Sequence, residues 1–181
     1  MIRRFTAPLG VIILALSAFS IAPAANAAKC PPESVGGKTI GWVEFDDVRV
    51  PIKETDYPAG GKLDPPASNK VAGMSTRHQN LRADQGTTVL AWHVRYGKKC
   101  KGTLNPLLQK DIGETFDIVT KSGQRATYQL EERTKVKRGK YKRDWFRLHG
   151  DRQIALFTCS DLRKGKFERT RVLIASPVET S

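Results

Sequence analysis

The feature that most constrains this chain is a succession of short β-forming segments between clusters of turn residues. Seven runs rich in β-branched and aromatic residues follow one another, and no long amphipathic helical pattern separates them. Gly, Pro, Asn and Ser gather between the runs, and TKSGQRATY is predicted to be a hairpin. Such a series predicts an all-β domain, either a closed or nearly closed barrel or a sandwich. The runs are TIGWVEF, VRVPIK, TTVLAWHVRYG, ETFDIVT, ATYQLEERTKV, RQIALFT and TRVLIAS.

The first 27 residues have the layout of a secretory signal. Arg3 and Arg4 precede an apolar stretch over residues 9–22, and a small-residue cleavage sequence, ANA, follows it. This stretch is shorter than the roughly 20 residues that a membrane-spanning helix needs. We therefore expect a cleaved signal peptide, and an uncleaved N-terminal membrane anchor is the alternative. Both interpretations predict an extracellular protein, either secreted or held at the cell envelope and facing outward.

The length of 181 residues supports one domain with a sizeable core. We expect residues 1–27 to be the signal peptide or anchor, residues 28–38 a linker, and residues 39–181 the β-domain.

The chain is strongly basic, with a formal net charge of +13. A basic excess of this size is one mark of nucleic-acid binding. Export argues against nucleic acid as a partner, because outside the cell the same charge suits anionic polymers of the envelope. A non-enzymatic basic β-domain that binds such polymers is therefore one hypothesis for the function.

The three cysteines leave one unpaired if the other two form a disulfide. Cys30 lies in the polar linker and Cys100 in a Gly- and Lys-rich loop, YGKKCKG, so we expect these two to be bridged. Cys159 then stays free at the end of an apolar run. A free cysteine is most often a small buried hydrophobe. The sequence has no CxxC, no HExxH and no His or Cys at ligand spacing, so neither a metal nor a cofactor is expected.

A nucleophilic cysteine needs a base or counter-cation, and a group that holds the developing oxyanion. His93 is the best candidate for the base, since it ends a strongly β-forming apolar run, TTVLAWHV. His78 lies in a polar loop and His149 in the turn RLHGDR. At the start of the last run, Arg169 and Arg171 supply guanidinium groups that are always charged and rich in donors.

Four segments resemble those of the sortase family, most closely the actinobacterial class E/F type. IALFTCS is similar to the family's L-x-T-C strand end, and GTTVLAWHVRYG to the strand that carries its histidine, usually V-I-A-G-H-V. RTRVLIAS is similar to the arginine and the apolar strand that follows it, and GGKLDPPASNKVAGMS to a turn segment with a leucine and prolines. The resemblance covers roughly residues 40–178.

The resemblance implies a single closed eight-stranded sortase-type β-barrel with short helical turns in the connections. It further implies a cysteine transpeptidase that acts on secreted proteins with an LPxTG-like C-terminal sorting signal. Such an enzyme cuts between Thr and Gly through a thioacyl-enzyme, and transfers the protein to an amine of a Gram-positive cell wall or to water.

Carried over to this chain, the resemblance makes Cys159 the nucleophile and His93 the general acid and base. Thr158 would help to position the substrate. Either Arg169 or Arg171 would be the catalytic arginine, and the alignment leaves both open. Trp92 departs from the family pattern, which has Gly before the histidine, so its indole either reshapes the pocket or faces outward.

Two other classes of envelope cysteine enzyme fit less well. An L,D-transpeptidase is expected to have an S-H-G-C type cluster, which this sequence lacks. A papain-like peptidase places its cysteine upstream of its histidine, whereas here His93 precedes Cys159.

Overall fold

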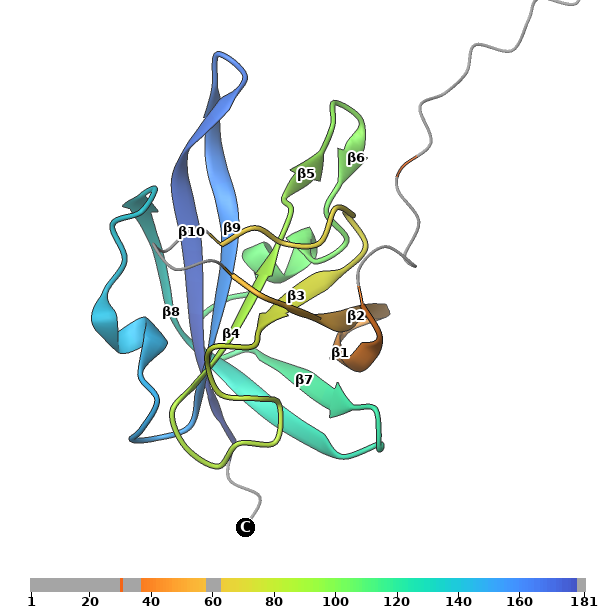
Figure 1. Ribbon diagram of the computed structural model, residues 1–181, viewed down its shortest axis with the longest axis vertical. Helices are drawn as coiled ribbons and strands as arrows, with labels where there is room; N and C mark the ends of the chain where they lie inside the picture. Colours follow the sequence, from red (N-terminus) through yellow and green to blue (C-terminus); the bar gives the residue numbers. More distant parts are fainter. Residues whose placement is uncertain (1–29, 31–36, 58–62, 179–181) are drawn as a thin grey trace, which may run out of the picture.

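The computed structural model describes residues 30, 37–57 and 63–178 (Figure 1). The export segment expected at residues 1–27, and most of the linker expected at 28–38, lie outside the described residues. The closed eight-stranded barrel predicted from the sequence is confirmed, with the strand order β1-β2-β3-β4-β9-β10-β8-β7. Its strands are β1 (Thr39–Phe45), β2 (Val48–Thr55), β3 (Ala72–Ser75), β4 (Thr87–Trp92), β7 (Thr115–Thr120), β8 (Arg125–Lys137), β9 (Gln153–Arg163) and β10 (Lys166–Pro177).

Four further elements lie in the connections. A two-stranded sheet, β5 (Arg95–Tyr96) with β6 (Cys100–Lys101), follows β4 directly and stands apart from the barrel. Two short 3₁₀-helices complete the fold, η1 (Asn105–Gln109) after β6 and η2 (Arg143–Phe146) between β8 and β9. In the part of the chain that the structure describes, no helix is long and apolar enough to cross a membrane.

The β7–β8 hairpin forms where the sequence predicts it. Thr120 donates its backbone N–H to the carbonyl of Gln124 at 2.8 Å, which closes the turn. Gly123 has a φ of 86°, a left-handed conformation that glycine adopts without steric cost.

Two parallel pairings bring together segments that are far apart in the sequence. β2 pairs with β3, and β4 pairs with β9. Strand β3, with the sequence AGMS, was not predicted, because four small or flexible residues give no β-forming run. The β4–β9 pairing has the larger consequence, since it sets the ends of two apolar runs side by side.

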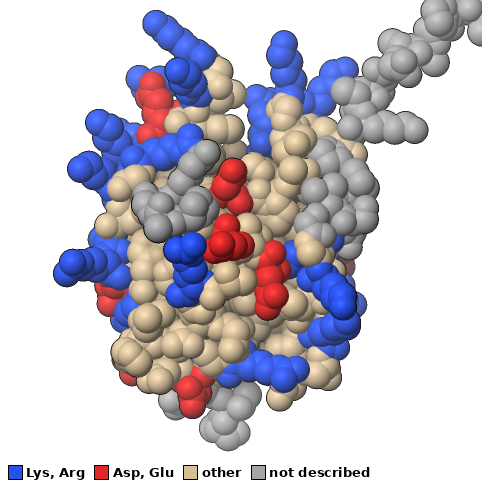
Figure 2. Space-filling model, in the orientation of Figure 1, with Lys and Arg blue, Asp and Glu red and all other residues tan. Residues whose placement is uncertain are grey.

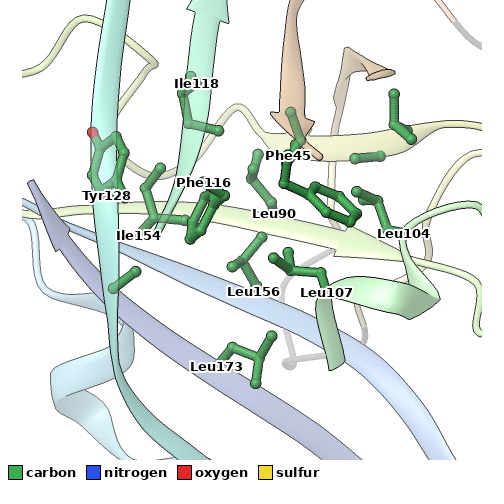
Figure 3. Packing of buried hydrophobic residues seen from close by; sticks show 14 of the residues in the cluster. Phe45, Leu90, Leu104, Leu107, Phe116, Ile118, Tyr128, Ile154, Leu156 and Leu173 are labelled. Carbon is green, nitrogen blue, oxygen red and sulfur yellow. The ribbon is translucent and has the colours of Figure 1, made fainter. Parts of the chain in front are cut away.

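The buried residues form two clusters on opposite faces of the sheet that contains β4, β9 and β10. The larger cluster fills the barrel and includes Leu90, Leu156 and Leu173 (Figure 3). The smaller one covers the outer face and includes Ala91, Phe157, Val172 and, from η2, Trp145. Because both faces of these strands are buried, their sequences are continuous apolar runs rather than alternating ones.

Candidate active site

Cys159 lies within β9, and His93 directly follows the neighbouring strand β4. In the parallel β4–β9 register, Trp92 pairs with Thr158. His93 is the residue after Trp92, and Cys159 is the residue after Thr158. Ala155, Phe157 and Cys159 alternate along β9, and the first two belong to the outer cluster. Cys159 therefore continues the outer face of the sheet. Its thiol is free and half-buried, and His93 is half-buried as well.

The backbone on either side of His93 is held by η1 and by the β5–β6 sheet. The Asn105 side chain donates to the carbonyl of Val94 at 2.8 Å and accepts a hydrogen bond of 3.3 Å from the Trp92 indole. Gly102 packs so closely that a Cβ at this position would lie 2.2 Å from the carbonyl oxygen of His93. Only glycine fits there without displacing that backbone. These contacts fix the position from which the imidazole projects.

Trp92, which departs from the family pattern, does not face outward. Its side chain is 2% exposed and belongs to the cluster that fills the barrel. It also contributes to the wall of the cavity beside Cys159. Its neighbour across the strands, Thr158, is buried and donates its hydroxyl to the Trp92 carbonyl at 2.9 Å.

The β9–β10 register places Thr170, and not an arginine, directly opposite Cys159. Arg171 lies opposite Thr158, and Arg169 lies opposite Ser160. Since directly opposed residues point to the same face of a sheet, both arginines emerge on the face away from the Cys159 side chain. Arg169 is exposed and lies 3.6 Å from the carboxylate of Asp161.

Two cavities meet at Cys159. The first, of about 170 Å³, lies on the outer face of the sheet, and the second, of about 870 Å³, extends toward the β5–β6 and β9–β10 hairpins, which project on the same side of the barrel (Figure 1). Leu63, Ala91, Phe157, Thr170, Tyr141 and Arg138 line the first cavity, among others. Arg95, Lys101, Leu162, Phe167 and Arg171 contribute to the second.

Burial controls the protonation of both candidate groups. It raises the pKa of the Cys159 thiol; the positive charge of Arg138 acts in the opposite direction, and the charge of Asp64 adds to the increase. Burial also lowers the pKa of His93, and this effect is opposed by a hydrogen bond from its ring to the Pro65 carbonyl and by the charge of Asp64. A neutral thiol beside a neutral imidazole is therefore the main state of the free protein near neutral pH.

The remaining cysteines and histidines lie away from this pair. Cys30 is bonded to Cys100 of β6, with 5.5 Å between their Cα atoms. His78 is half-buried, where its Nδ1 lies 2.7 Å from the Ser75 hydroxyl and its ring 5.3 Å from that of Phe146. His149 is exposed. Among the described residues, no three His, Cys, Asp or Glu side chains group so that they could hold a metal ion.

The sequence did not single out several residues that line the first cavity or act on the pair. Asp64 and Pro65 lie in the segment GGKLDPPASNKVAGMS, which resembles a family segment but in which neither residue was assigned a role. Arg138 is one of many cations, and follows β8 in a run of alternating Lys and Val. Tyr141 lies in the long connection between β8 and β9, where the only feature that we identified from the sequence is the turn RLHGDR.

Comparison with known proteins defines the fold. No protein-family model matches the chain, and no curated protein matches it in sequence. Solved structures do match it. Sortase C1 of Streptococcus agalactiae is 16% identical with a TM-score of 0.60, over 79% of this chain and 71% of that one. The lid mutant of sortase A from Corynebacterium diphtheriae is 16% identical with a TM-score of 0.62, over 83% of this chain and 75% of that one. Sortase C-1 of Actinomyces oris is 15% identical with a TM-score of 0.61, over 79% of this chain and 76% of that one. The chain has the sortase fold.

Proposed function

We propose that this protein is a sortase, a cysteine transpeptidase of the cell envelope, with Cys159 as its nucleophile and His93 as its general acid and base. One observation carries the proposal. The β4–β9 register pairs Trp92 with Thr158, so His93 and the free thiol of Cys159 each come one residue later on neighbouring backbone segments, and Cys159 lines a cavity on the outer face of a sortase-fold barrel. Cysteine chemistry needs this pairing of a nucleophile and a proton donor.

The first step forms a bond between the Cys159 sulfur and the scissile carbonyl carbon. The thiolate supplies the electron pair, and the carbonyl π electrons move to oxygen. When they return, the bond between carbon and nitrogen breaks and the leaving amine takes a proton from the His93 imidazolium. The thioacyl-enzyme is then attacked by an amine or by water, and neutral His93 accepts a proton from that nucleophile.

The two cavities suit two partners. The first is narrow and largely apolar, with Leu63, Ala91, Phe157 and Tyr141 in its walls, and would take an extended LPxTG-like sorting signal of a secreted protein. The second is wider and would admit the amine of a cell-wall acceptor to the thioester from the other side of Cys159. Assignment to the class E/F type among sortases is part of this proposal.

That either Arg169 or Arg171 is the catalytic arginine of the family mechanism stays a prediction. Arg171 shares the second cavity with Cys159, whereas Arg169 pairs with Asp161 at the surface. Thr158, predicted to position substrate, lines the first cavity, but its hydroxyl is already bonded to the Trp92 carbonyl. Its role would therefore be to hold β4 and β9 together beside the reacting groups.

A non-enzymatic domain that binds anionic envelope polymers is the second candidate, because the chain is so basic. On the face seen in Figure 2, Lys and Arg side chains are spread around the margins, and acidic side chains lie between them near the centre. A polymer-binding surface on this face would be expected to be continuous and basic. The dispersed pattern favours the enzyme.

The test is incubation of the exported domain with a panel of LPxTG-like peptides, with and without candidate amines, followed by mass spectrometry of the products. We expect cleavage between Thr and Gly, abolished by Cys159→Ala and nearly abolished by His93→Ala. Cleavage by Cys159→Ala at the rate of the unmodified protein would refute the assignment of the nucleophile. If no peptide is cleaved while the domain binds anionic wall polymers, the second candidate stands instead.

A further inference from the structure

Three side chains from three adjacent strands form one row on the outer face of the sheet. Cys159 of β9 lies opposite Thr170 of β10, and Thr170 lies opposite Val136 of β8. Opposed residues share a face, so these three point the same way. Arg138 is two residues beyond Val136, which places it on that face as well. Its backbone N–H donates to the Glu168 carbonyl at 3.2 Å, so the ladder continues to this residue.

The small side chain of Thr170 leaves room between Arg138 and the thiol. Thr170 is 6% exposed, and its hydroxyl lies 3.3 Å from that of Tyr141. Arg138, Thr170, Tyr141 and Cys159 all line the first cavity.

Arg138 is free to act on the site. Its side chain is exposed, and among the residues that the structure describes no carboxylate lies within ion-pair distance of it. It is also the cation whose charge opposes the rise that burial causes in the pKa of Cys159. By contrast, Arg169 is held by Asp161 on the other face.

We propose that Arg138, the first residue after β8, is the arginine that binds the scissile carbonyl and stabilises the oxyanion at Cys159, in place of an arginine on β10. This role rests on the proposed function. When the thiolate attacks, the carbonyl electron pair moves to oxygen, and the Arg138 guanidinium donates hydrogen bonds to the resulting anion. The electron pair then returns to expel the amine, which takes its proton from His93. Because the donor gains strength only as the charge develops, it acts mainly on the transition state.

The first arm of the test measures kcat/KM for a sorting-signal peptide. Loss of an oxyanion donor typically costs on the order of 10²–10³ in turnover, and we expect that loss for Arg138→Gln. Arg138→Lys restores only part of it, because an ammonium lacks the planar fork of donors. The matched control is Lys137→Gln, which removes a cation one residue earlier on the opposite face and stays within about threefold of the unmodified protein. Arg169→Gln and Arg171→Gln are expected to lose less than Arg138→Gln.

The second arm needs no peptide. The rate of alkylation of Cys159 by iodoacetamide, followed against pH, reports the ionisation of the thiol. Arg138→Gln should move this profile to higher pH, since the thiolate loses a nearby positive charge, whereas Lys137→Gln should leave it in place.

The two arms separate the possible failures. If the unmodified protein cleaves peptides but Arg138→Gln changes neither kcat/KM nor the alkylation profile, the inference on Arg138 is wrong and the proposed function stands. The same holds if Arg171→Gln shows the hundredfold loss and Arg138→Gln does not. If the unmodified protein cleaves no peptide, the proposed function fails, and with it the substrate role of Arg138, whatever the alkylation profile shows.

Discussion

The Thr158 hydroxyl donates a 2.9 Å hydrogen bond to the carbonyl of Trp92, across 66 residues of sequence. This bond ties β9 to β4 one residue before Cys159 and one residue before His93. It is buried, so its loss leaves a polar group without a partner and without water. The relative position of the two reacting groups depends on such contacts.

The first prediction concerns this bond. Thr158→Val keeps the shape of the side chain and removes the hydroxyl, which should lower the free energy of unfolding by about 1–3 kcal/mol. It should also reduce kcat by a larger factor than it raises KM, because the hydrogen bond that joins the strands next to Cys159 and His93 is lost. Thr158→Ser retains the hydroxyl and is the control. Urea unfolding and steady-state kinetics measure the two effects, and an unchanged kcat for Thr158→Val would show that the bond has no positioning role.

The second prediction concerns Asn105, whose amide group bonds to residues on both sides of His93. Asn105→Ala should reduce kcat by on the order of tenfold to a hundredfold, since small misplacements of a catalytic group are costly. KM should change little, because Asn105 lies outside the cavity proposed for the peptide. Asn80→Ala, which removes an exposed asparagine bonded to the backbone of Arg82, is the control. Equal kinetics for both variants would contradict the positioning role.

The positions of Cys159 and His93 could be predicted because both residues end apolar runs that can only be buried strands. That these runs lie side by side could not be predicted, since the β4–β9 pairing is parallel and joins distant segments. The choice of the catalytic arginine shows most clearly what the sequence cannot predict. Which residue of β10 faces Cys159 depends on the register of the hairpin between them, and the sequence around residues 161–168 allows more than one turn. Arg138 was not found because nothing local marks it among its cationic neighbours.

The third prediction concerns pH. The active form needs a thiolate and an imidazolium together, while burial raises the pKa of Cys159 and lowers that of His93. Below the His93 pKa the form in which both groups are protonated takes over, and above the Cys159 pKa the form in which both are deprotonated does. Between the two values the fraction of the active ion pair is small and constant. We therefore expect kcat/KM to show a broad plateau, with an acid limb below about 6.5 and an alkaline limb above about 8.5, the unperturbed values. A narrow optimum at acidic pH would contradict the order of the two pKa values.

The fourth prediction concerns the disulfide between Cys30 and Cys100, which are 70 residues apart. Closing a loop of this length restricts the unfolded chain, and the chain-entropy model gives about 4–4.5 kcal/mol of stabilisation. The double variant Cys30→Ser with Cys100→Ser should lose about this much free energy of unfolding in a urea titration. Non-reducing peptide mapping should recover the linked pair from the unmodified protein and leave Cys159 open to alkylation. A bridge that contains Cys159 would contradict both the pairing and the role of the nucleophile.

The central claim is that Cys159 forms a thioester with the carbonyl carbon of its substrate. Intact-mass measurement of the protein mixed with an LPxTG-like peptide and quenched in acid tests it most directly, with Cys159→Ala as the control. We predict a mass increase equal to the acyl portion of the peptide, which maps to Cys159, disappears on treatment with hydroxylamine and is absent from Cys159→Ala. Peptide cleavage with no adduct on Cys159, or with the same adduct on Cys159→Ala, would contradict it.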